Sequence, residues 1–463
     1  MQGIPGEDGD EVDEEKDGFK LRHGKLPLAC LDDKNLYAAA MRRPATMKTN
    51  SAERRVVITG MGVISPSGND LKTFWSNVRG GISAAAPVTR FDASRLPVKI
   101  AAEVKNFDVS EHIKSRKPGR FDLSIQYGVA AAALAVKDAG IDLSGLDPDR
   151  VGVVEGTTMS GAESIIKLRD SFRDGQNNFR ALHPYNVVAS YCGEGSSTIS
   201  MHLGIHGHAV TYCSGCASGS DAIGHAARMI RLDDVDVVVA GGAEETMEMV
   251  HVGLCRIRSM TEQNGSPAGA MRPFDRSRDG FLLGEGSAFF VLEELSHALG
   301  RGARLYAEIA GHGHSCEAWH ATDPHPDGVG YVRALEKALR DARTHPAEVD
   351  YINAHGSATP LNDPIETKAI KRVFREHAKR VAISATKPVT GHLMGASGAI
   401  EAMICALAIW HGEIPPTINL NEPDPACDLD YVPGQARAYP VKVAVNLNAG
   451  FGGRYASLVL KKM

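Results

Sequence analysis

Residues 235–240 (VDVVVA), followed by Gly241 and Gly242, are the stretch that most directly decides the fold. A short run of branched apolar residues closed by glycines is typical of a strand buried on both faces. Residues 151–154 show the same pattern, and an alanine-rich segment with helical character precedes them at residues 127–138. Alternation of buried strands with helices predicts an α/β fold whose parallel or mixed sheet is covered by helices.

The order of elements recurs along the chain. Residues 305–311 (LYAEIAG) resemble the opening strand at residues 55–60. We therefore divide the chain into two halves, 54–300 and 301–463, which a duplicated α/β unit would explain. Look-alike strands also arise in unrelated α/β proteins, so the pattern alone leaves the duplication open. A doubled unit would place functional groups from both halves at a shared central seam.

Composition excludes several classes of protein. The 463 residues are 43% hydrophobic and 23% charged with a net charge of −5, which gives no nucleic-acid or membrane footprint. The sequence contains no run of 18 apolar residues, so it predicts no transmembrane helix. Eight cysteines are too few for a disulfide framework and suit a reducing, cytoplasmic location. The acidic start is unlike a targeting leader, and we expect residues 1–53 to form a disordered N-terminal extension.

The first candidate for chemistry is a cysteine. Residues 213–219 (CSGCASG) precede a helical pattern in which Ile223, Ala227 and Ile230 form one apolar stripe. The small residues around Cys216 permit a tight strand-to-helix turn and the close approach of a thioester. A thiol at a helix N-terminus meets the positive end of the macrodipole, which favours the thiolate. The segment therefore favours Cys216 as a nucleophile.

Three other interpretations of Cys216 remain open at this point. An unpaired cysteine is often an inert hydrophobic residue of a core. Cys213 and Cys216 also have the spacing of a redox dithiol, although no thioredoxin-like context precedes them. A zinc half-site would need a second cysteine pair, and none has the required spacing.

Two loops rich in small residues contain further candidates. Residues 353–360 (NAHGSATP) follow an apolar strand signal, which places His355 at the end of a buried strand. Residues 385–398 (ATKPVTGHLMGASG) place Lys387 and His392 before an apolar helix. One such histidine is more often structural than catalytic. Two of them in glycine-flanked loops, together with a candidate cysteine, favour catalysis.

Two more patterns are less specific. Residues 450–453 (GFGG) lack the lysine and hydroxyl residue of a nucleotide loop, so their amides suit either an oxyanion hole or a structural turn. Four histidines and Cys316 between residues 312 and 325 invite a metal interpretation, but their spacing matches no usual zinc pattern. We expect no metal and no cofactor.

Together these segments resemble the β-ketoacyl-(acyl carrier protein) synthases of the thiolase superfamily, especially the type II elongating enzymes. The resemblance extends over residues 54–463. It implies a thiolase-like α/β fold, in which a duplicated unit builds five αβαβα layers. Each motif is weak alone, whereas seven of them in the family order are specific. The motifs are residues 57–62 (VITGMG), 216–219 (CASG), 240–244 (AGGAE), 278–286 (RDGFLLGEG), 353–356 (NAHG), 386–392 (TKPVTGH) and 450–453 (GFGG).

The resemblance implies a decarboxylative condensation. Cys216 would accept an acyl chain from a carrier-protein thioester. His355 and His392 would donate hydrogen bonds to the thioester carbonyl of malonyl-carrier protein as CO2 leaves. The resulting carbanion would attack the acyl-cysteine and give a 3-oxoacyl product two carbons longer. This role requires neutral imidazoles that carry the proton on Nε2.

Three supporting roles also come from the resemblance. Lys387 would support the charge arrangement of the site, and Glu401 would belong to a hydrogen-bond network below it. Phe451 would be a gating aromatic residue, and its backbone amide would join that of Cys216 in the oxyanion hole.

The chain departs from the family pattern in three places. The elongating synthases commonly have Thr-Ala before the nucleophile, and this chain has Ser214 and Gly215. After the GFGG motif the usual Thr-Asn is Arg454 and Tyr455, which should alter substrate access. Residues 190–195 (SYCGEG) are atypical for a stretch that helps to shape the acyl pocket. The sequence therefore does not distinguish a general fatty-acid substrate from a specialised lipid or polyketide substrate.

The expected partner is an acyl carrier protein, which is strongly acidic. The basic run Lys114, Arg116, Lys117 and Arg120 could attract it, or could be an ordinary solvated helix end. The resemblance also implies a homodimer. A competing hypothesis is a non-catalytic partner subunit of a ketosynthase heterodimer, but such subunits lose the nucleophile that is retained here.

Overall fold

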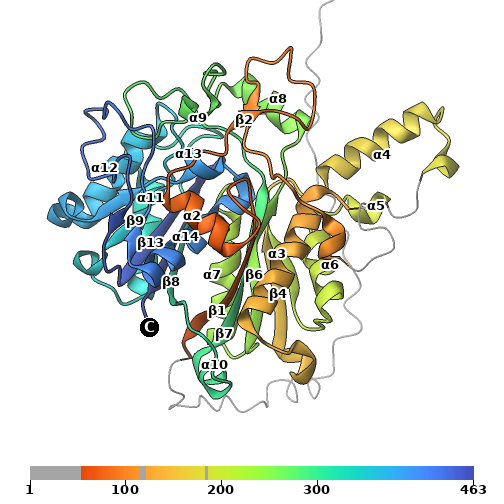
Figure 1. Ribbon diagram of the computed structural model, residues 1–463, viewed down its shortest axis with the longest axis horizontal. Helices are drawn as coiled ribbons and strands as arrows, with labels where there is room; N and C mark the ends of the chain where they lie inside the picture. The colour runs from red at the N-terminus through yellow and green to blue at the C-terminus, as the bar shows by residue number, and fades with distance from the viewer. Residues whose placement is uncertain (1–53, 114–120, 183–185) are drawn as a thin grey trace, which may run out of the picture. The chain divides into compact units, whose positions relative to one another are not determined.

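The computed structural model describes residues 54–113, 121–182 and 186–463, shown in Figure 1. Residues 53–463 group into one compact unit. The extension expected at residues 1–53 lies outside the described residues, and so does the basic run at residues 114–120.

A mixed ten-stranded sheet organises the fold, in the order β10-β9-β13-β14-β8-β1-β7-β6-β4-β5. Read from each end of the sheet inward, the two sets of five strands have the same succession of parallel and antiparallel pairs. The sets meet where β1 and β8 pair antiparallel. The strands are β1 (Val56–Ile64), β4 (Val151–Gly156), β5 (Ala209–Tyr212), β6 (Val237–Glu244), β7 (Gly286–Glu294), β8 (Ala307–Cys316), β9 (Tyr351–Asn353), β10 (Ala382–Ser384), β13 (Val443–Gly450) and β14 (Arg454–Lys461).

Helices form three layers around the two sets of strands. α3 (Leu123–Ala139) and α6 (Glu194–Leu203) pack on the first set, and α11 (Val329–Asp341) packs on the second beside α12 (Asn362–Phe374). α7 (Ser218–Arg231) and α14 (Ser397–His411) contact strands of both sets, so they lie between them. This arrangement confirms the predicted thiolase-like αβαβα fold.

Two glycines show how closely the two sets of strands match. A Cβ atom on Gly62 of β1 would lie 2.1 Å from the carbonyl oxygen of Ala131 in α3. A Cβ atom on Gly313 of β8 would lie 2.0 Å from the carbonyl oxygen of Ala334 in α11. Equivalent strands therefore approach equivalent helices at equivalent glycines. We interpret this match as a duplication, with the division of the chain near residue 300 as our proposal.

The central helix α14 is apolar on almost all sides, and Glu401 is its buried charged residue. The stretch Met394–His411 is long and apolar enough to cross a membrane by length and composition alone, but most of it is buried inside the fold. A helix packed between two layers of strands has no solvent face, which explains its composition.

The remaining helices and short strands are α2 (Leu71–Arg79), α4 (Ala162–Asp174), α5 (Asn186–Ala189), α8 (Glu248–Ile257), α9 (Pro267–Ala270), α10 (Leu295–Gly300), α13 (Lys387–Thr390), β2 (Ala86–Pro87), β3 (Ile100–Ala101), β11 (Glu413–Ile414) and β12 (Arg437–Ala438).

Candidate active site

Cys216 lies in a tight turn two residues before α7. Gly215 adopts a φ of 65°, a conformation that only glycine adopts without strain. The amide of Ser214 donates to Ser218 Oγ (2.9 Å), and that hydroxyl donates to the carbonyl oxygen of Gly215 (2.6 Å). The small residues of this segment therefore form the strand-to-helix turn that the sequence predicts.

The protonation state of Cys216 differs from the expectation for a helix N-terminus. Burial raises the pKa of the thiol to about 12, although the nearby Lys387 ammonium acts in the opposite direction. Removing an anion from water disfavours the thiolate more strongly than the surrounding positive charge favours it. At neutral pH the free enzyme therefore holds Cys216 as a thiol.

The N-terminal ends of the two central helices meet at glycines. A Cβ atom on Gly219 of α7 would lie 2.7 Å from the backbone nitrogen of Ala399 in α14. A Cβ atom on Gly398 of α14 would lie 2.5 Å from the nitrogen of Ser220 in α7. This close approach brings the loop that contains His392 toward Cys216.

His355 follows β9 in a loop that two carboxylates of α12 hold. The amides of His355 and Gly356 donate to the two oxygens of Glu366, at 2.7 and 2.9 Å. Asp363, one helical turn earlier, accepts from the amides of Ala358 and Phe274. Both carboxylates are completely buried. These acids were not among the residues predicted from the sequence, although two acids three residues apart directly after the NAHGSATP loop were a usable signal.

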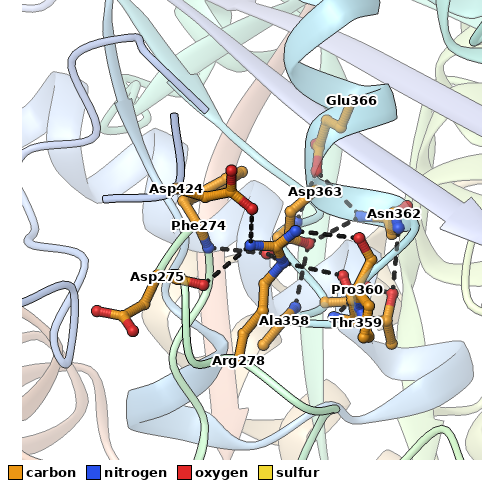
Figure 2. Close-up of polar contacts among 12 residues, drawn as sticks. Phe274, Asp275, Arg278, Ala358, Thr359, Pro360, Asn362, Asp363, Glu366 and Asp424 are labelled. Atoms are coloured by element: carbon orange, nitrogen blue, oxygen red, sulfur yellow. Dashed lines mark hydrogen bonds and ion pairs between the residues drawn. The ribbon is translucent and has the colours of Figure 1, made fainter. Parts of the chain in front are cut away.

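Arg278 holds the far end of the same loop, as Figure 2 shows. Its guanidinium donates to the carbonyl oxygens of Thr359 (3.2 Å) and Pro360 (3.0 Å) and pairs with Asp424 at 2.6 Å. A guanidinium has five donors in a rigid fork, so it fixes several backbone carbonyls at once. In the sequence Arg278 is only part of a family motif, and the structure gives it a part in holding the His355 loop.

Lys387 lies at the centre of a buried polar network. Its ammonium donates to Glu401 Oε1 (2.5 Å), to the carbonyl oxygen of His355 (2.6 Å) and to His355 Nδ1 (3.3 Å). An ammonium has three donors, and all three have acceptors here. Glu401 Oε2 accepts from Asn448 of β13 (2.5 Å), and Ser220 of α7 contacts the same asparagine. The network therefore connects the nucleophile helix with the histidines.

The hydrogen bonds define the tautomers of both histidines. Because Lys387 donates to Nδ1 of His355, the proton of that neutral ring lies on Nε2. Nδ1 of His392 accepts from the amide of Met394 (3.2 Å), so its proton lies on Nε2 as well. Burial and the charge of Lys387 hold both imidazole pKa values well below the usual 6.5. Both rings are therefore neutral Nε2–H donors at neutral pH, and their centroids lie 5.4 Å apart.

The turn between β13 and β14 completes the site. A Cβ atom on Gly450 would lie 2.8 Å from the nitrogen of Cys216, so only glycine permits this approach. Phe451 follows it and is 39% exposed. Cys216, His355, His392 and Phe451 line one cavity, while Lys387 and Glu401 are buried. The structure thus brings the six candidate residues into one region.

The departures from the family pattern lie in different places. Tyr455 lines the cavity and packs its ring on Tyr331, with a centroid separation of 4.5 Å. The guanidinium of Arg454 donates instead to the carbonyl oxygen of Cys213 at 3.3 Å. Residues 190–195 lie at the start of α6, outside the residues that line this cavity. Only Tyr455 of the Arg-Tyr pair therefore faces the substrate space.

The fold and the site define a protein with a thiol and two imidazoles at the seam of a duplicated α/β unit. Comparison with known families gives this class its name. The chain matches the N-terminal domain of β-ketoacyl synthase over residues 53–298 and the C-terminal domain over residues 306–421. It belongs to the β-ketoacyl synthase family.

Similar proteins include curated relatives and solved structures. The chain is 41% identical to 3-oxoacyl-(acyl-carrier-protein) synthase 2 of Coxiella burnetii and 40% identical to that of Synechocystis sp., in each case over 89% of this chain and 99% of the relative. Among solved structures, the ishigamide ketosynthase/chain length factor superposes with a TM-score of 0.83 at 36% identity, over 89% of this chain and all of that chain. A type II polyketide ketosynthase bound to its acyl-carrier protein superposes with a TM-score of 0.81 at 32% identity, with the same coverage of both chains.

Proposed function

We propose that the chain is a 3-oxoacyl-(acyl-carrier-protein) synthase. It extends a Cys216-bound acyl chain by two carbons in fatty-acid or related specialised lipid or polyketide biosynthesis. The observation that carries the proposal is the pair of neutral Nε2–H imidazoles that share a cavity with the thiol. The names of the curated relatives, which the chain matches over 99% of their length, state the same reaction.

The first step is acyl transfer. The sulfur of Cys216 attacks the carbonyl carbon of a carrier-protein thioester, and the carrier thiol leaves with the proton. The amides of Cys216 and Phe451 stabilise the oxyanion of the tetrahedral intermediate. The close approach of Gly450 to the Cys216 amide supports this pairing.

The second step is condensation. His355 and His392 donate to the thioester carbonyl of malonyl-carrier protein, and this stabilises the enolate formed when the carboxylate leaves as CO2. The carbanion attacks the acyl carbon, the C–S bond to Cys216 breaks, and the sulfur takes up a proton. Lys387 keeps the Nδ1 atom of His355 in its acceptor state, and Glu401 balances the lysine charge.

The expected partners are an acyl carrier protein and a second copy of the chain. The similar ketosynthase captured with its acyl-carrier protein supports the first. β5 ends the strand order, and an open edge strand is a common site of association. Exposed apolar side chains in the segment from α4 to α6 also suit contact with a second copy of the chain; they include Ile165, Phe172, Phe179, Val187 and Met201. Free thiols suit a cytoplasmic enzyme.

A second candidate is a subunit that works only beside a different ketosynthase-like chain. This candidate is supported by the similarity to the ishigamide ketosynthase/chain length factor structure. The two candidates differ in what the purified chain does alone. We would expose it to acyl-carrier proteins loaded with saturated, branched and 3-oxo chains, and measure the adduct on Cys216 by intact mass. Malonyl-carrier protein is then added. A 3-oxoacyl product supports the synthase, whereas a chain that forms neither adduct nor product contradicts it.

A further inference from the structure

A buried acid connects the nucleophile loop with the second half of the chain. Asp221, in the first turn of α7, accepts from Ser214 Oγ (2.5 Å), His312 Nε2 (3.0 Å) and His314 Nδ1 (3.1 Å). It is only 2% exposed. The two histidines belong to the group whose spacing invites a metal interpretation but matches no usual zinc pattern. Among the described residues no group of three or more His, Cys, Asp or Glu side chains is arranged to hold a metal ion. The two histidines instead converge on one carboxylate.

The carboxylate of Asp221 stays ionised at any working pH. Hydrogen bonds from His312, His314 and Ser214 hold its pKa well below the usual range despite burial, and Asp221 in turn raises the pKa of His314. A carboxylate is an acceptor only, so the hydroxyl of Ser214 must donate to it. This fixes the orientation of the Ser214 side chain through a charge-assisted bond, which is stronger than one between neutral groups.

Ser214 is also in contact with the turn that completes the site. A Cβ atom on Gly450 would lie 2.9 Å from the carbonyl oxygen of Ser214 and 2.8 Å from the amide nitrogen of Cys216. Gly450 directly precedes Phe451, whose amide is the second donor of the proposed oxyanion hole. Ser214 therefore connects Asp221 with the segment where the amide of Cys216 approaches Gly450.

We propose that Asp221, oriented by His312 and His314, is a positioning residue for the oxyanion hole. Through Ser214 it holds the amide of Cys216 against the turn that contains Phe451. The proposal rests on the acyl-transfer function proposed above and adds four residues to it, Asp221, Ser214, His312 and His314, none of which lines the cavity. Small displacements of a catalytic group matter, since an error of about 1 Å can cost about 100-fold in rate.

Two reactions at the same thiol test this role. Acyl transfer passes through a tetrahedral oxyanion, whereas alkylation of Cys216 by iodoacetamide is a substitution that forms none. In Asp221→Asn and Ser214→Ala, we expect transfer from acyl-carrier protein to fall about 10- to 100-fold while alkylation stays within about threefold of the wild type. Ser214→Ala leaves Asp221 paired with both histidines, so it tests the proposal even if Asp221→Asn does not fold.

A matched control comes from the central strand β7, at the end that lies beside the start of β6. Glu293 of β7 is also completely buried and accepts from a histidine (His297), an arginine (Arg301) and a hydroxyl (Thr59). Glu293→Gln should leave both rates at Cys216 unchanged in the folded protein. Unchanged transfer in the Asp221 and Ser214 variants, or a parallel fall of transfer and alkylation, would overturn the positioning role. A wild-type enzyme that is alkylated but never acylated would contradict the proposed function instead.

Discussion

The two halves of the sheet have the same strand order and contribute opposite kinds of chemistry. In the first half the chain leaves β5 and enters the central helix α7 through a turn of Ser, Gly and Cys. In the second half it leaves β10 and enters the equivalent helix α14 through a loop with a lysine and a histidine. One scaffold therefore presents a nucleophile from one side and hydrogen-bond donors from the other, and the difference lies in the loops.

The two sides are also stabilised differently. Backbone turns and serine hydroxyls shape the loop around Cys216, and one anion, Asp221, anchors it. Buried ionisable groups hold the histidine side, because Lys387, Glu401 and Glu366 all bond to His355 or to one another. An imidazole needs a defined tautomer to act as a donor, whereas a thiol needs only access and nearby amides. The buried polar network, which costs desolvation free energy, therefore surrounds the histidines, where the position of a proton matters.

Removal of the nucleophile should have the largest effect. Cys216→Ala should abolish the acyl adduct completely, since no other group in the cavity can form the thioester. Cys213→Ala should keep the adduct, and this pair of variants also tests the redox-dithiol interpretation. Intact mass after incubation with acyl-carrier protein measures both. A full adduct in Cys216→Ala would remove the thiol from its proposed role.

Loss of a donor on the other side should separate the two steps. His355→Ala or His392→Ala should lower 3-oxoacyl formation about 100- to 1,000-fold, the usual cost of one lost oxyanion-type donor. Acylation of Cys216 should be reduced much less. His345, an exposed histidine of the same half, gives the control variant His345→Ala. Equal loss of acylation and condensation would contradict the proposal that the histidines of the second half act mainly in condensation.

The buried ion pair should matter for stability as well as for rate. Lys387→Met leaves Glu401 buried without its cation and should lower the free energy of unfolding by about 3–5 kcal/mol. The double variant Lys387→Met/Glu401→Gln removes the unpaired charge and should regain much of that loss. Urea denaturation followed by circular dichroism measures both. A single variant as stable as the wild type would show that the pair contributes nothing to folding.

The smallest effect concerns pH. Because the pKa values of His355 and His392 lie well below 6.5, both rings stay neutral as the pH falls from 8 to about 6.5, the ordinary histidine value. The rate of malonyl-carrier protein decarboxylation by pre-acylated enzyme should therefore stay constant over this range and fall only at lower pH, where the rings begin to gain protons. A midpoint at pH 6.5 or above would show ordinary, solvated imidazoles.

Local sequence predicted much of the site. Cys216, His355 and His392 each follow a strand in a loop of small residues, and such loops can be recognised from a few neighbouring positions. The apolar stripe of Ile223, Ala227 and Ile230 likewise predicted a buried helix, and all three residues are at most 1% exposed in α7. The spacing of the histidines from His312 to His325 argued against a metal site, but spacing along the chain could not reveal that His312 and His314 share a partner on α7.

Short stretches of sequence establish the alternation of strands and helices and the identity of the reactive groups, because both depend on residues close together in the chain. The fold sets the protonation of these groups through burial and long-range contacts. Burial in the fold disfavours the thiolate of Cys216, although the thiol keeps access to the cavity, and His355 keeps its proton on Nε2 because Lys387 reaches Nδ1 from another loop. The partners of Asp221 were equally hidden, since they come from a strand in the other half. Burial and long-range contacts set these properties, and neither can be predicted from any short stretch of sequence.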